Sequence, residues 1–175
     1  MSIITENTFE TALVKSLTEQ GGYTEGNSPD YSPELGMFKY EVIKFLQESQ
    51  PKRWEKISAI HGSDADNRVI QRLYKELDLR GSLDVLRNGF VDYGVRFQMA
   101  FFQPASGLNP DAVDLYNKNN LKVYRQIYYS NKNRNSVDVL LSLNGIPVAT
   151  LELKNQFTGQ NVGNALKQYS TTRDN

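Results

Sequence analysis

Residues 136–154 read SVDVLLSLNGIPVATLELK, and this stretch decides the fold. Two apolar runs, 136–143 and 147–154, have the length and composition of strands. Between them lies Asn144-Gly145, a dipeptide that favours a tight hairpin turn because both positions accept a positive φ. The stretch therefore predicts two antiparallel strands joined by a short turn.

A hairpin of this kind places the start of its first strand beside the end of its second strand. We therefore expect Asp138 to lie across from Glu152 and Lys154. Two carboxylates can hold Mg²⁺ through oxygen atoms, and the metal can polarise a phosphoryl oxygen and help to generate hydroxide. A lysine can position the attacking water and offset transition-state charge. The trio is therefore typical of metal-assisted phosphodiester hydrolysis.

The spacing of the last two members is not specific by itself. An acid followed two positions later by lysine occurs once in the chain, at Glu152 and Lys154. Roughly 1.3 such pairs are expected by chance. The alternative interpretation is that Asp138 and Lys154 form a cross-strand ion pair on a solvated face of the sheet.

The surrounding sequence predicts helices before the hairpin and strands close to it. Apolar spacing, caps and turn residues indicate the element boundaries. We expect helices over 5–20, 33–48, 63–79 (opened by a capping-box variant at Ser63 and Asp66), 109–117 and from Gln160 onward, and further strands over 95–102 and 121–129.

Length and composition are those of one soluble domain. The 175 residues include no cysteine, and no apolar run approaches the roughly 18 residues of a membrane span. The N-terminus lacks a signal-peptide pattern, so we expect a cytoplasmic protein. Lysine plus arginine and aspartate plus glutamate each number 20, so a globally basic nucleic-acid binder is excluded.

A local basic stretch stands out from this neutral background. Residues 117–135 contain no acid and five bases, which could contact DNA phosphates. They are Lys118, Lys122, Arg125, Lys132 and Arg134. The alternative interpretation is a solvated, asparagine-rich loop and strand.

Three other features receive structural interpretations. We expect His61, the single histidine, to be a structural loop residue rather than a general base, and Trp54 to pack in the core or between domains. The tyrosines of the strand that contains Arg125 either stack on bases or, as we expect, pack against neighbouring strands; they are Tyr124, Tyr128 and Tyr129.

The chain resembles a known family at these motifs. Asp138, the Asn-Gly-Ile-Pro turn and the Leu-Glu-Leu-Lys-Asn run at 151–155 resemble the N-terminal nuclease domain of type I restriction enzyme motor (R) subunits, of the PD-(D/E)xK superfamily. Residues 119–126, which end in a glutamine, Arg80-Gly81 and the first helix around Glu10 are also similar.

The resemblance implies a fold and a set of site residues. The expected fold is α/β, a restriction-endonuclease-like core with a central mixed β-sheet flanked by helices. Asp138 and Glu152 match the metal-binding acids, Lys154 the catalytic lysine, Glu10 a first-helix acid near the metal, and Gln168 a glutamine of the next helix. The family's Gln-x-x-x-Tyr pattern is not kept, because the fourth residue after the glutamine is threonine.

The resemblance also implies a cofactor and partners. Mg²⁺ is the expected cofactor, with ATP used by a motor that follows the nuclease in the family. No Walker-type motif occurs here, so we expect residues 1–175 to be a single nuclease domain from a longer subunit. The expected partners are double-stranded DNA and the specificity and methylation subunits. The alternatives are a catalytically silent DNA-binding or docking domain and a stand-alone repair-type nuclease.

Overall fold

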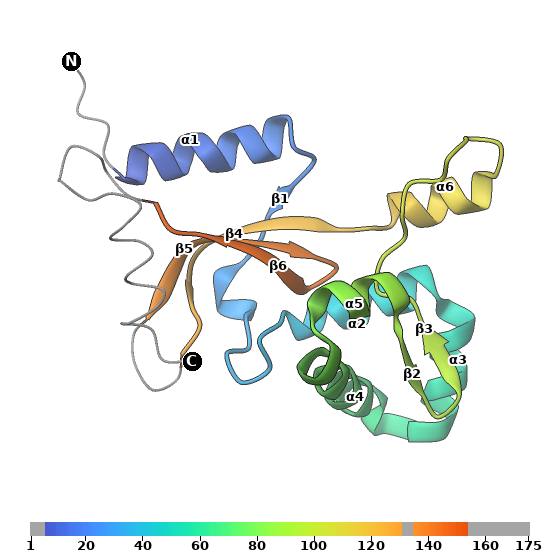
Figure 1. Cartoon of the computed structure of the whole chain (residues 1–175). Helices are drawn as coiled ribbons and strands as arrows, with labels where there is room; N and C mark the ends of the chain where they lie inside the picture. Colours follow the sequence, from blue (N-terminus) through green and yellow to red (C-terminus); the bar gives the residue numbers. More distant parts are fainter. Residues whose placement is uncertain (1–5, 131–134, 154–175) are drawn as a thin grey trace, which may run out of the picture.

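A four-stranded sheet forms the centre of the fold (Figure 1). The computed structural model describes residues 6–130 and 135–153. The strand order is β1-β4-β5-β6, with β1 spanning Thr24–Glu25, β4 Leu121–Tyr128, β5 Ser136–Leu143 and β6 Ile146–Leu151. Strand β1 runs parallel to β4, whereas the other neighbours are antiparallel. A mixed sheet flanked by helices confirms the predicted fold class.

The hairpin of β5 and β6 has the predicted turn. Asn144 and Gly145 have φ values of 54° and 85°, as a two-residue turn with two positive φ angles requires. Pairing continues from this turn to Val139 opposite Leu151, where β6 ends three residues before the predicted boundary at Lys154. The strand ends here are where the candidate site residues lie.

Helix α1, Glu6–Glu19, covers one face of the sheet, as Figure 1 shows. Its buried Val14 packs with Val123 of β4, Val139 of β5 and Leu153. The helix matches the one predicted over 5–20 at the described residues. This packing holds α1 against strands β4 and β5.

The opposite face of the sheet is covered by the segment that leads from β1 to the second helix. It contains the short 3-10 turn η1, Ser28–Asp30. The Phe38 ring stacks on the Tyr124 ring with centroids 3.7 Å apart and an angle of 11° between the planes. A Cβ atom at Gly26 would overlap the Tyr124 ring, so only glycine fits that position.

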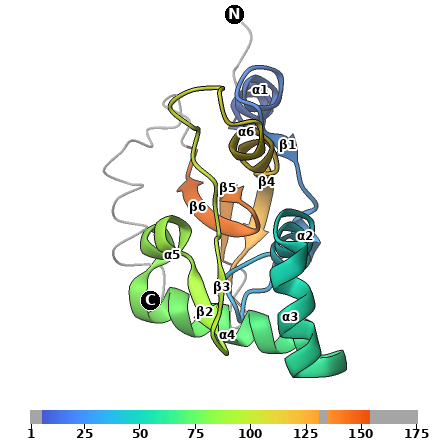
Figure 2. The same cartoon turned by 90° about the vertical axis from the view of Figure 1, so that its right-hand side faces the viewer.

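A group of helices and a small hairpin packs beside the turn of β5 and β6 (Figure 2). Its members are α2 (Lys39–Ser49), α3 (Pro51–His61), η2 (Gly62–Asp64), α4 (Ala65–Arg80), α5 (Ser82–Asn88), β2 (Phe90–Asp92) and β3 (Val95–Phe97). Helix α6, Pro110–Asn117, follows and begins at the predicted Asn109 cap, whose side chain accepts a hydrogen bond from Ala112 N.

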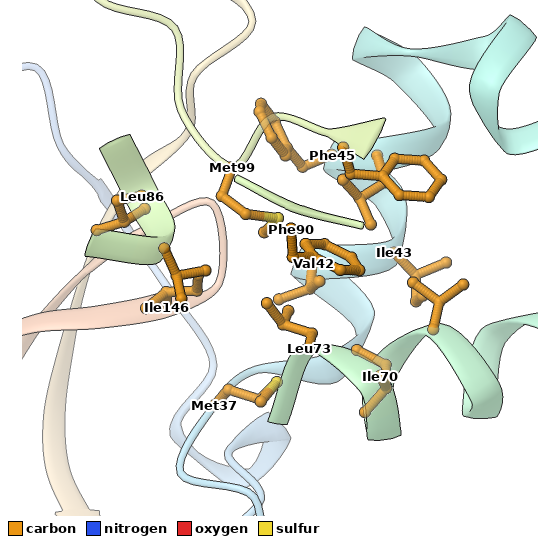
Figure 3. Packing of buried hydrophobic residues seen from close by; sticks show 14 of the residues in the cluster. Met37, Val42, Ile43, Phe45, Ile70, Leu73, Leu86, Phe90, Met99 and Ile146 are labelled. Atoms are coloured by element: carbon orange, nitrogen blue, oxygen red, sulfur yellow. The ribbon is translucent and has the colours of Figure 1, made fainter. Parts of the chain in front are cut away.

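The turn of β5 and β6 connects the sheet to this helical group. Figure 3 shows Ile146, from the hairpin, beside Leu86 of α5 in the largest apolar cluster. The backbone oxygen of Gly145 accepts a hydrogen bond from Phe38 N, the residue before α2. Complete burial of an isoleucine side chain such as Ile146 contributes about 1.5–3 kcal/mol. The turn is therefore held in place both by a backbone hydrogen bond and by the packing of a buried side chain.

Several predicted boundaries are wrong. The second helix begins at Lys39 rather than at residue 33, because Ser32 N bonds Met37 O and closes a loop there. The helix predicted over 63–79 begins at Ala65, and no side-chain cap is formed at its start. Elements α3, α5, β1 and β2 were not predicted.

The strand predicted over 95–102 is also too long, and side chains explain where it stops. Strand β3 ends at Phe97 because the Gln50 amide takes both backbone groups of Gln98, donating to its oxygen and accepting from its nitrogen. Asn119 does the same for Phe101. These backbone groups are therefore satisfied without a strand partner.

No helix among residues 6–130 and 135–153 has the length and apolar character that a membrane span needs. The helix predicted from Gln160 lies outside the described residues.

Candidate active site at the open end of the hairpin

Asp138 is tied to the chain that follows β6. Its Oδ2 accepts a hydrogen bond of 2.7 Å from Leu153 N. The turn alone would place Asp138 opposite Leu151, but the pairing shifts by one residue between Leu141 and Ser142. Val139 therefore pairs with Leu151, which puts Asp138 opposite Glu152. Glu152 is half-buried and Leu153 is buried in the cluster under α1. The expected proximity of Asp138 to the start of the Glu152–Lys154 run is thus confirmed, while Lys154 lies outside the described residues.

Glu10 of α1 reaches the same region from above the sheet. It is 7% exposed. Its Oε1 accepts a hydrogen bond of 2.5 Å from Arg125 Nε of β4. Further bonds from the Arg125 guanidinium reach Thr11 at 3.1 Å and Asn7 at 3.5 Å. A buried carboxylate is held by a paired charge here, which is the condition under which burial of an acid is tolerated.

Gln126 connects the two acids, and sequence reasoning gave it no role. Its Nε2 donates to Glu10 Oε2 at 2.9 Å and to Asp138 Oδ1 at 3.5 Å. Glu10 and Asp138 therefore approach one amide group from helix and strand, although they are 128 positions apart in the sequence. The signal available in the sequence was the glutamine at the end of the 119–126 match.

A pocket of about 510 Å³ opens at this point. It is lined by Asn7, Glu10, Arg125, Gln126, Asp138 and Leu153. Its walls carry two carboxylates, one guanidinium and two amides, so it offers hard oxygen ligands for a cation and a positive group for a phosphate.

The donor set fits a divalent cation in its chemistry. Mg²⁺ prefers carboxylate and amide oxygens, and one amide N–H group already lies between the oxygens of Glu10 and Asp138. The described residues 6–130 and 135–153 contain no group of three His, Cys, Asp or Glu side chains arranged as a metal site. Glu10 and Asp138 are thus a pair rather than a group of three, and Gln168, like Lys154, lies outside the described residues.

The predicted DNA-contacting bases do not share one surface where they are described. Arg125 lies on the α1 face with Glu10. Lys122 lies on the other face and pairs with Glu41 of α2 at 2.5 Å. Lys118 donates to Glu48 O at 2.9 Å. Lys132 and Arg134 are outside the described residues. Of the three described bases, only Arg125 lines the pocket.

The other candidate residues are structural. Tyr124 is 1% exposed and stacked on Phe38, and burial raises the pKa of its hydroxyl, so it is not available to stack on a base. His61 ends α3 rather than lying in a loop, and its Nε2 is 2.8 Å from Asp92 Oδ2 in a buried pair. Trp54 packs against the main apolar cluster. The packing interpretation is confirmed for Tyr124 and Trp54, but it is wrong for Tyr128, which is 58% exposed.

Asn144 has a second role that the turn motif did not reveal. Its side chain is fully buried, its Oδ1 accepts from Asn120 N, and its Nδ2 donates to Met99 O and Asn119 Oδ1. Asn119 in turn donates to Tyr116 O of α6. The asparagines at the start of β4 therefore fix the hairpin to α6 and to the segment after β3.

Comparison with known protein families gives a match over nearly the whole chain. The family described as type I restriction enzyme R protein N terminus matches residues 3–175. No curated protein and no solved structure matches the chain.

Proposed function

The chain belongs to the family of type I restriction enzyme R protein N termini, and from this we propose that it is the Mg²⁺-dependent DNA nuclease module of a restriction complex. Its substrate would be double-stranded DNA that lacks the protective modification. Sequence choice and methylation would come from partner subunits, and translocation by an ATP-driven motor would belong to the longer R protein.

One observation carries this proposal most directly. Glu10 from α1 and Asp138 from β5 meet at a single pocket, and Asp138 is bonded to the backbone one residue after Glu152. Carboxylates brought together by helix and strand packing, beside a pocket with an arginine, suit the binding of a cation and a phosphate. A purely structural ion pair needs no such opening.

We assign the residues as follows. Asp138 and Glu152 would hold the metal, with Glu10 as a third acid. When bound, Mg²⁺ polarises a phosphoryl oxygen and lowers the pKa of a bound water. Lys154 would orient the attacking water and stabilise negative charge, and Gln168 would contact DNA or order the site. Arg125, which lines the pocket, would contact a DNA phosphate, together with Lys132 and Arg134.

A catalytically silent docking or DNA-binding domain is the second candidate. The observation in its favour is that both oxygens of Glu10 already accept hydrogen bonds, from Arg125 and Gln126. A carboxylate satisfied in this way can be a structural group. This candidate predicts that DNA or partner binding survives the loss of Asp138.

The decisive experiment is cleavage of unmodified plasmid by the full R protein with its partners, Mg²⁺ and ATP. The variants are Lys154→Ala, Asp138→Asn and, as a matched control, Lys75→Ala on the exposed face of α4. We expect the first two to lose cutting while ATP hydrolysis continues, and the control to cut normally. Undiminished cutting by Lys154→Ala and Asp138→Asn would contradict the nuclease assignment and favour the docking domain.

A further inference from the structure

The backbone of β4 has a local irregularity at Gln126. Its φ is 51°, whereas strand residues have strongly negative φ values. The pairing on either side is undisturbed, because Arg125 faces Val139 and Ile127 faces Val137 in one continuous register. No residue is inserted, so the irregularity is not a register-shifting bulge. It lies directly opposite Asp138.

The irregularity determines where the Gln126 side chain points. In an extended strand, neighbouring side chains point to opposite faces. Here Arg125 and Gln126 are consecutive, and both reach the carboxylate of Glu10 on α1. The next residue, Ile127, is buried with Tyr124 on the other face. The positive φ thus directs the Gln126 amide into the pocket.

The left-handed conformation of Gln126 costs free energy, and packing of its side chain does not offset this cost. A left-handed backbone is unfavourable for a residue with a Cβ atom, and glutamine is not among the residues that adopt it readily. Gln126 is exposed, so apolar burial does not offset this cost. The interactions gained are the hydrogen bonds of its amide to Glu10 and Asp138. Strain of this kind is characteristic of functional sites.

We propose that Gln126 is the positioning residue of the metal site: its amide holds Glu10 and Asp138 in the arrangement that a divalent cation requires. The amide N–H group lies between the two like-charged carboxylates and bonds both, which keeps them together without the cation. The inference rests on the proposed nuclease function and names a residue outside the ligand set assigned there.

The test is Mn²⁺ binding by the 175-residue chain, measured by titration calorimetry. The key variant is Gln126→Gly, because glycine accepts the positive φ and removes the whole side chain, including the amide. Gln71→Ala, an exposed glutamine of α4, is the matched control, and Asp138→Asn reports on the metal site itself. We expect Gln126→Gly to weaken binding roughly 10-fold or more, with an unchanged circular dichroism spectrum and a thermal midpoint no lower than that of the wild type.

An NMR titration with Mg²⁺ adds a spectroscopic readout. The side-chain amide signal that disappears in Gln126→Gly should shift in the wild type as Mg²⁺ is added. Wild-type affinity in Gln126→Gly, combined with loss of binding in Asp138→Asn, would overturn the positioning role and leave the metal site in place. Absence of Mn²⁺ binding by the wild type would overturn the proposed metal site, and this inference with it.

Discussion

The carboxylate of Asp138 accepts the backbone N–H of Leu153 at 2.7 Å, two residues beyond the last residue of β6. The side chain of one strand thus takes the place of a backbone partner where strand pairing ends. This bond fixes the backbone on both sides of Glu152 relative to Asp138. The hairpin therefore sets the position of Asp138 relative to the chain around Glu152, while α1 and β4 supply the other residues of the pocket.

Substitutions of Asp138 should distinguish its structural role, as the acceptor for Leu153 N, from the role of its negative charge. Asp138→Ala leaves Leu153 N without its acceptor and should lower the free energy of unfolding by about 1–3 kcal/mol. Asp138→Asn keeps an acceptor oxygen and should cost less than about 1 kcal/mol. Both should lose Mn²⁺ binding, because the charge is gone. Urea denaturation followed by circular dichroism measures the first effect, and equal destabilisation by the two variants would contradict this account.

The hairpin turn should be intolerant of any side chain at Gly145. A Cβ there would lie 2.8 Å from Phe38 O and from Val42 N, and the φ of 85° adds backbone strain. We expect Gly145→Ala to lower the free energy of unfolding by about 3 kcal/mol or more. Gly94→Ala is the matched control, since Gly94 has a φ of 78° but open space around it, and it should cost about 1 kcal/mol. Equal losses would show that the contact with α2 is unimportant.

The hairpin was predictable because its signals are local. Asn144-Gly145 suits a turn with two positive φ values, and the apolar runs on either side supply the strand pattern. The turn does not fix the whole register, however, because a shift of one residue between Leu141 and Ser142 is needed to bring Asp138 opposite Glu152. Helix α1 was equally accessible, since its apolar face repeats at helical spacing.

The missed elements depend on partners distant in the sequence. A proline such as Pro51 ends a helical pattern, but it is also well suited to the first position of a new helix, and α3 begins there. Gln50 ends β3 through bonds to Gln98, 48 positions away, which no local pattern indicates. Strand β1 has only two residues and exists through its pairing with β4.

The basic stretch illustrates a different error. The prediction grouped the basic residues by their closeness along the chain. Lys122 and Arg125 are an odd number of positions apart in one strand, however, so their side chains point to opposite faces. The alternation of side chains along a strand is enough to predict that these two bases do not share a surface. The role of Gln126 was less accessible, because a left-handed residue inside a strand reverses the rule from which its direction would be predicted.

Acid should weaken the contact between α4 and α5. Hydrogen bonds from Arg80 and Asn88 hold the pKa of Asp84 below its ordinary value of 3.8. The pKa of Asp84 is therefore lower in the folded state than in the unfolded state. The charged carboxylate stabilises the fold fully above its ordinary pKa, and this stabilisation is lost as the pH falls below about 4. Urea midpoints between pH 6 and pH 3 should therefore fall less for Asp84→Asn than for the wild type. The exposed Asp78→Asn serves as control, and an identical decline in all three proteins would refute the assignment.

Arg125 should compete with a cation for Glu10. Its guanidinium bonds Glu10 Oε1 and lies in the pocket wall, so a cation there meets a like charge. We expect Arg125→Met, which keeps most of the side-chain length, to tighten Mn²⁺ binding by on the order of 3- to 10-fold and to weaken DNA binding. Lys122→Met removes the same charge from the other face of β4 and should leave Mn²⁺ affinity unchanged. Calorimetry and a DNA-binding titration measure the two effects. If Arg125→Met weakened both, the arginine would be a support for Glu10 rather than its competitor.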